Sequence, residues 1–112
     1  MVLAREKPAL FDAFWFEGGG DREARAFQVW AHERGFHAAW VQGIEYQSEY
    51  RGGETNVINE TMWVIDNRYV KGEQLDMLEM PPKRWFIIGL DGRPFLMSKE
   101  AFERRFEKVV GA

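Results

Sequence analysis

The last third of the chain carries the pattern that most restricts its fold. Two apolar runs, 84–88 and 95–97, flank a turn that contains Asp91-Gly92. Glycine accepts the positive φ that a tight hairpin demands, so this spacing predicts two antiparallel strands. Ser98 follows as a good N-cap residue, with two phenylalanines one helical turn apart behind it. The segment therefore predicts a strand, a turn, a second strand and a short helix over about 98–107.

A longer helix is expected between about residues 21 and 34. Asp21 can cap its start, and Gly35 stands where a left-handed C-cap residue belongs. Apolar residues between these ends recur at three- and four-residue spacing and so share one helix face: Ala24, Phe27, Trp30 and Ala31.

Four further stretches predict strands, because apolar side chains alternate or run together between turn-forming residues. They are 7–16, 36–41, 44–50 and 57–66, the last with a break at Asn59-Glu60 as an option. Residues 71–80 fit a short helix or an irregular loop, which Pro81-Pro82 ends. The elements together predict an α+β fold, in which an antiparallel or mixed sheet of about four to six strands packs against both helices.

Length, charge and cysteine content restrict the class of protein. The 112 residues suit a single domain over 1–112, and no repeat or linker divides them. The net charge of -3 argues against a general nucleic-acid binder. The absence of cysteine excludes disulfides and thiol chemistry and fits a reducing cytoplasm. The sequence has no secretory h-region and no run long enough to span a membrane, so we expect a cytoplasmic protein.

No motif predicts a catalytic or metal site. His32 and His37 are the only histidines, and they lack a matched carboxylate spacing. The glycines at 18–20 lack the Lys-Ser/Thr of a phosphate loop and are better explained as a flexible joint before the helix. Paired carboxylates stay open for acid–base chemistry, but no spacing singles out a pair among 18 acids. We expect no catalytic residue, no metal site and no cofactor.

Two clusters are candidate binding residues. The first mixes cations with aromatic faces, a combination that can bind phosphates and stack bases. Its members are Arg68, Tyr69, Lys71, Lys83, Arg84 and Trp85, with Trp63 as a further stacking residue. The second is an acidic edge in the middle of the chain that bears Tyr46 and Tyr50, and that can mimic nucleic acid or contact a basic protein groove. The competing interpretation is a solvated surface, with Trp85 in the core.

The two ends of the chain carry a characteristic order of residues. Lys7-Pro8 precedes Asp12-Ala13-Phe14-Trp15, and the other end runs from Trp85 through Gly92 to Phe106. This order resembles a widespread group of small bacteriophage and prophage proteins, which open with a Lys-Pro strand and close with an aromatic strand, turn, strand and helix. The chain departs from the group at Pro82-Lys83-Arg84, where Pro-Gly-Asp is usual, at Phe106, where Tyr is common, and in a longer middle.

The resemblance implies an α+β fold and a phage accessory gene expressed in the bacterial cytoplasm. It implies no catalytic residue, because the group has no established activity to carry over. We therefore expect a non-enzymatic protein-interaction module that binds a host bacterial protein, such as a component of a defence complex, in the manner of an anti-CRISPR protein. Contact with a membrane or directly with nucleic acid is not expected, and a homodimer stays open.

Two alternatives to this function stay open. One is a small-ligand binder that sequesters a nucleotide signal, in which Arg68, Lys83 and Arg84 hold phosphates while Trp63 or Trp85 stacks on the base. The other is a virion or assembly component.

Overall fold

The computed structural model covers the whole chain and describes residues 2–3, 9–47, 53, 55–66 and 77–108. The described part is an α+β fold, as the sequence predicts. Its elements are, in order, β1 (Asp12–Phe16), α1 (Asp21–Glu33), β2 (Phe36–Val41), β3 (Ile44–Gln47), β4 (Thr55–Ile58), β5 (Thr61–Asp66), β6 (Leu78–Met80), β7 (Arg84–Ile88), β8 (Pro94–Met97) and α2 (Lys99–Arg105).

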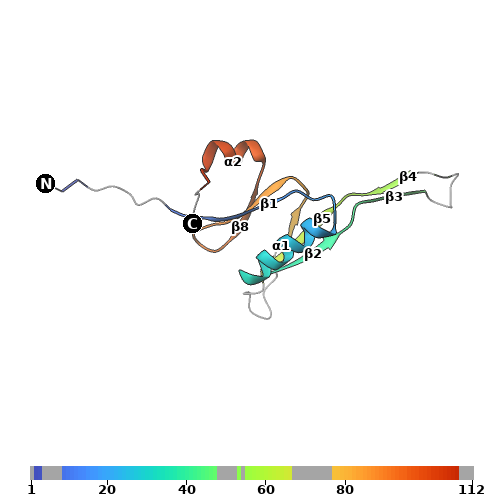
Figure 1. Ribbon diagram of the computed structural model, residues 1–112, viewed down its shortest axis with the longest axis horizontal. Helices are drawn as coiled ribbons and strands as arrows, with labels where there is room; N and C mark the ends of the chain where they lie inside the picture. The colour runs from blue at the N-terminus through green and yellow to red at the C-terminus, as the bar shows by residue number, and fades with distance from the viewer. Residues whose placement is uncertain (1, 4–8, 48–52, 54, 67–76, 109–112) are drawn as a thin grey trace.

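The described strands form three small antiparallel sheets, where the sequence suggested one. Their orders are β1-β7-β8, β2-β5-β6 and β3-β4. The second and third sheets are formed by consecutive strands. Gln42-Gly43 separates β2 from β3, and Asn59-Glu60 separates β4 from β5. Figure 1 shows the result: β3 and β4 continue the line of β2 and β5 and extend away from the rest of the molecule.

The C-terminal unit has the predicted order of strand, turn, strand and helix. β7 and β8 pair antiparallel, with Phe86 opposite Leu96. Gly92 has a φ of 83°, as the turn signal predicts, and its N–H donates to the Gly89 carbonyl at 2.9 Å. The Asp91 carboxylate accepts from the backbone N–H of Arg93 at 3.0 Å, which closes the turn. α2 ends at Arg105, slightly before the expected end at 107.

Ser98 caps α2 as predicted, and its replacement by alanine should lower the free energy of unfolding by about 1 kcal/mol. Its hydroxyl accepts from the backbone N–H of Ala101 at 3.2 Å, and alanine leaves that donor without a protein acceptor. Urea denaturation of Ser98→Ala measures the loss. Ser98→Asp keeps an acceptor and should recover most of the lost stability. Equal stability of Ser98→Ala and the natural chain would contradict the assignment of Ser98 as the cap.

α1 begins differently from the prediction. Asp21 is its first helical residue and not its cap; the N-cap position belongs to Gly20, which makes no side-chain bond. The Asp21 carboxylate lies 3.3 Å from the Arg25 guanidinium one turn later. The C-terminal prediction is confirmed, since Gly35 follows the helix with a φ of 86°.

Two of the predicted strands have different bounds, and one stretch outside the predicted strands forms a strand. The first begins at Asp12, and the stretch 57–66 divides at Asn59-Glu60 into β4 and β5. Residues 78–80, for which the sequence left helix or loop open, form a strand instead, because β5 offers a free edge and Met62 pairs with Met80. Residues 7–8, 48–50 and 71–76 of these predictions lie outside the described part.

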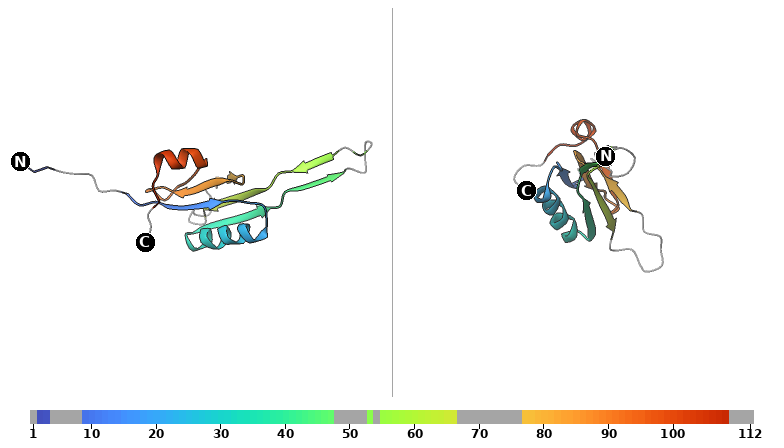
Figure 2. Two further views of the ribbon diagram at one scale, coloured as in Figure 1. Left: turned by 45° about the horizontal axis from the view of Figure 1, so that its top comes forward. Right: turned by 90° about the vertical axis from the view of Figure 1, so that its right-hand side faces the viewer.

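The core lies between α1 and the two three-stranded sheets. α1 contributes Phe27, and the sheets contribute Phe36 and Phe86, all fully buried. The Phe86 ring meets the Phe27 ring at 5.2 Å and the Phe36 ring at 5.5 Å, both edge to face. α2 lies on the opposite side of the strands from α1 (Figure 2). The β1-β7-β8 sheet therefore has α1 on one side and α2 on the other.

Candidate functional site

The paired strands β3 and β4, here called the ribbon, form the most exposed regular element. Ile44 lies opposite Ile58 and Tyr46 lies opposite Asn56 in the antiparallel register. Figures 1 and 2 agree that neither helix covers the ribbon. Both strands therefore offer a free surface and a free edge on which another molecule can dock.

The ribbon exposes apolar side chains. Side chains two residues apart share a face of a strand, so Ile44 and Tyr46 lie together with Ile58 opposite. Their residues are 44%, 48% and 39% exposed. Val57 is exposed on the other face, beside Glu45. A two-stranded ribbon with no covering layer has marginal stability by itself, and exposed apolar patches mark interaction surfaces.

The base of the ribbon is fixed to the body by Glu60. The backbone N–H of Gly19 donates to both Glu60 carboxylate oxygens, at 2.8 and 3.2 Å. Gly43 approaches the same point, because a Cβ there would lie 3.2 Å from the Glu60 nitrogen. The glycine segment before α1, predicted to be a flexible joint, thus holds a carboxylate of the chain itself.

Charge on the described part of the ribbon and its base is entirely negative. Residues 41–47 and 55–60 include the carboxylates of Glu45 and Glu60 and no lysine or arginine. Glu60 is engaged by Gly19, so Glu45 is the carboxylate that faces solvent from the ribbon itself. Such a surface favours a partner with positive charge.

The predicted binding residues lie in several places. Tyr46 belongs to the ribbon, whereas Tyr50, Arg68, Tyr69 and Lys71 lie outside the described residues. Trp63 lies in β5, in register with Ala39 and Glu79 and therefore in the second sheet.

The remaining members of the cation and aromatic cluster do not share one surface. Lys83 is exposed, with a φ of 60°, and its N–H donates to the Phe16 carbonyl at 2.7 Å. Arg84 turns back to the Lys83 carbonyl at 3.0 Å. Trp85 is the next residue of β7, so its side chain lies on the other face of the sheet, against α2.

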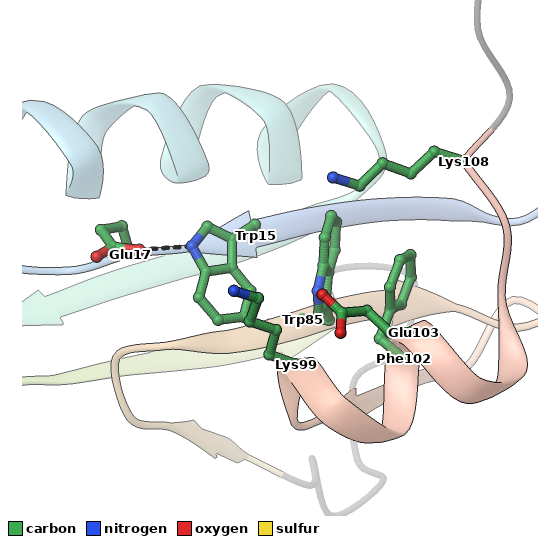
Figure 3. Close-up of a pocket in the computed structure, with 7 residues that line it drawn as sticks. All are labelled: Trp15, Glu17, Trp85, Lys99, Phe102, Glu103 and Lys108. Carbon is green, nitrogen blue, oxygen red and sulfur yellow. Dashed lines mark hydrogen bonds between the residues drawn. The ribbon is translucent and has the colours of Figure 1, made fainter.

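A second surface, which the sequence did not reveal, surrounds Trp85. Trp15 pairs with Trp85 across β1 and β7, and the ring of Phe102 from α2 stacks on Trp85 at 3.9 Å. These rings and four charged residues line a cavity of about 260 Å³, here called the aromatic pocket (Figure 3). The charged residues are Glu17, Lys99, Glu103 and Lys108. Two tryptophans distant in the sequence become neighbours only through strand pairing, so local patterns carry no signal of the pocket.

The described part carries neither a metal-ligand cluster nor a membrane-spanning helix. No group of three or more His, Asp or Glu side chains there could hold a metal ion, and both histidines are exposed. Neither α1 nor α2 has the length and apolar character of a membrane-spanning helix. Comparison of the chain with protein-family models, curated proteins and solved structures gave no match.

Proposed function

We propose that the chain is a non-enzymatic module that binds another protein through the ribbon. The observation that carries the proposal is the exposure of Ile44, Tyr46 and Ile58 on an element that no other layer covers. A partner seated there would bury apolar surface and supply the missing layer. Tyrosine at the centre of such a patch is among the residues that contribute most to binding at protein interfaces.

The partner has a basic surface in this proposal. Glu45 lies on the ribbon with no cation among its described residues, so a positively charged partner meets complementary charge. Charge of this kind increases the association rate and selects among partners, while the apolar side chains supply most of the affinity.

The resemblance of both chain ends to phage and prophage proteins suggests where the partner belongs. It favours a protein of a bacterial host, reached in the cytoplasm, and within that class a component of a defence system that the module inhibits by occupying its basic groove. This part of the proposal rests on the resemblance and on the acidic character of the ribbon together. It is separate from the location of the binding surface, which the exposure of the ribbon alone supports.

A pull-down with ribbon variants tests whether the ribbon is the binding surface. A tagged chain should retain one or more specific proteins from a bacterial lysate, and Tyr46→Ser/Ile58→Ser should reduce that affinity by about tenfold or more, because apolar anchors are removed. Val29→Ser/Leu90→Ser is the matched control, since these residues are also apolar, are 60% and 74% exposed, and lie on α1 and the β7–β8 turn. The control should bind like the natural chain.

Two further results would contradict the proposal. Equal binding by the ribbon variant and the control, at equal melting temperature, would place the interface elsewhere. Assembly of the purified chain into large particles, measured by light scattering, would favour the virion component instead. A retained partner that is released as salt rises from low to moderate concentration is expected, because exposed charge pairs are screened.

A further inference from the structure

The aromatic pocket is built on the face of the β1-β7-β8 sheet that α2 covers in part. Trp15 and Trp85 project from adjacent strands, with ring centroids 5.6 Å apart and planes inclined by 55°. Phe102 is buried against the far side of Trp85, whereas both tryptophans are only partly buried. The two indoles therefore form a corner that is open to a ligand on one side (Figure 3).

The aromatic side chains are held in place before any ligand arrives. The Trp15 indole N–H donates to the Glu17 carboxylate at 2.6 Å. Trp85 and Phe102 are nearly parallel, with an angle of 11° between their planes, and Phe102 stacks in turn on Phe106 at 5.3 Å. Side chains that are already ordered lose less conformational entropy when a ligand binds. A planar ring that enters the corner thus meets fixed aromatic faces.

The charges around the corner include two cations with which an anionic group of a ligand can pair. Lys99 and Lys108 both line the cavity, and neither forms an ion pair with any residue in the described part of the chain. The Lys108 ammonium lies 5.5 Å from the Trp85 ring centre, where it already occupies the favourable position for a cation. Glu17 and Glu103 line the same cavity. The Glu17 carboxylate accepts from Trp15, so Glu103 is the carboxylate that the anionic group of a ligand must avoid.

The volume of the cavity limits how large an aromatic anion can bind in it. A volume of about 260 Å³ lies just below the range of ordinary small-molecule sites, which begins near 300 Å³. It admits a single base with its sugar and leaves the phosphate at the mouth, and it cannot enclose a dinucleotide. The sequence suggested Arg68, Lys83 and Arg84 as phosphate ligands for a nucleotide, whereas the cations that line this cavity are Lys99 and Lys108.

We propose that the aromatic pocket binds a mononucleotide, whose base stacks on the open indole face of Trp15 with its edge against Trp85, and whose phosphate pairs with Lys99 and Lys108. Base stacking on aromatic side chains tolerates every base, so the site discriminates weakly among them. The phosphate is the negatively charged partner that the ammonium groups of Lys99 and Lys108 lack in the described part of the chain. This site lies on a different element from the ribbon, and the two proposals stand independently.

Isothermal calorimetry with the full chain tests the pocket. AMP, GMP, CMP and UMP are titrated, together with adenosine, inorganic phosphate and a single-stranded oligonucleotide. All four mononucleotides should bind, and adenosine or phosphate alone should bind at least about tenfold more weakly, because each makes only one of the two kinds of contact. An oligonucleotide that binds more tightly per site than the mononucleotides would overturn the assignment to free nucleotides in favour of a strand.

Matched variants locate the binding. Lys99→Met/Lys108→Met removes both charges and keeps the apolar stems, and should weaken AMP binding by about tenfold or more. Arg104→Met removes a cation from the exposed face of α2 outside the cavity and should leave binding unchanged. Trp15→Leu should weaken binding, and Trp15→Phe should retain most of it because a ring remains for stacking.

Two results would overturn the proposal that the aromatic pocket binds a mononucleotide. No heat with any mononucleotide at about 1 mM, where a weak site would still fill, would mean that the pocket has another occupant or none. Equal affinity of Lys99→Met/Lys108→Met and Arg104→Met for AMP would mean that the nucleotide binds elsewhere. Tyr46→Ser/Ile58→Ser in the ribbon should bind AMP normally, so failure of the ribbon proposal leaves this result unaffected.

Discussion

Replacing Phe86 with alanine is expected to lower the free energy of unfolding by about 3–5 kcal/mol. Phe86 is fully buried in β7, and its ring lies 5.2 Å from the Phe27 ring, 5.5 Å from the Phe36 ring and 5.8 Å from the Trp30 ring. These partners come from α1 and β2, so one side chain joins the first sheet to the helix and to the second sheet. Alanine would leave a cavity between β7 and these two elements.

Chemical denaturation of Phe86→Ala measures this loss, with Phe95→Ala as the matched control. Phe95 lies on the adjacent strand β8 and is only partly buried, so its truncation should cost less than half as much. A typical small domain is stable by only about 5–15 kcal/mol. Where Phe86→Ala does not fold, Phe86→Leu gives a smaller, measurable loss. Equal losses for Phe86→Leu and Phe95→Leu would contradict a central role for this ring.

The parts of the fold that the sequence predicts well are those with local causes. The β7–β8 turn follows from Gly92, which needs its positive φ, and the start of α2 follows from the Ser98 hydroxyl three residues before its donor. The face of α1 follows from the spacing of Ala24, Phe27 and Ala31, all of which are buried. Each of these signals operates within one helical turn or one hairpin, so neighbouring residues suffice to read it.

The parts that the sequence does not predict depend on residues far apart in the chain. β1 pairs with β7, which sets Trp15 beside Trp85, and no local pattern states that register. β6 is only three residues long and becomes a strand because β5 is available to pair with it. The aromatic pocket and the division into three sheets both follow from such pairings, which explains why the sequence singles out Trp85 but not the residues around it.

The start of α1 also depends on a residue that is distant in the sequence. An acidic residue before an apolar periodic run predicts a cap, and Asp21 satisfies that rule. In the structure the backbone donor just before the helix, the Gly19 N–H, is satisfied by Glu60 from the distant β4–β5 junction. Gly18 and Gly19 adopt φ values of 75° and 88° to present that donor, and α1 begins directly after them.

Replacing Gly18 with alanine is therefore expected to lower the free energy of unfolding by about 2–4 kcal/mol. Its φ of 75° is unfavourable for a residue with a Cβ, and that Cβ would lie 2.5 Å from the Pro82 Cβ and 2.8 Å from a Glu60 carboxylate oxygen. Pro82 has a rigid ring and cannot rotate away. Relief of the clash would require the segment before β7 to move away from the start of α1. Thermal and urea denaturation measure the effect.

Gly19→Ala separates the two causes of that loss. Gly19 also has a positive φ, 88°, but a Cβ there meets no atom within 4 Å, so alanine should cost only about 1 kcal/mol from backbone strain. It keeps the N–H that Glu60 accepts, so the hydrogen bond survives. The difference between the two variants then measures the contact with Pro82 and Glu60. If both variants lose the same stability, the close approach of Gly18 to Pro82 does not contribute, and the base of the ribbon is not fixed in the way that these distances imply.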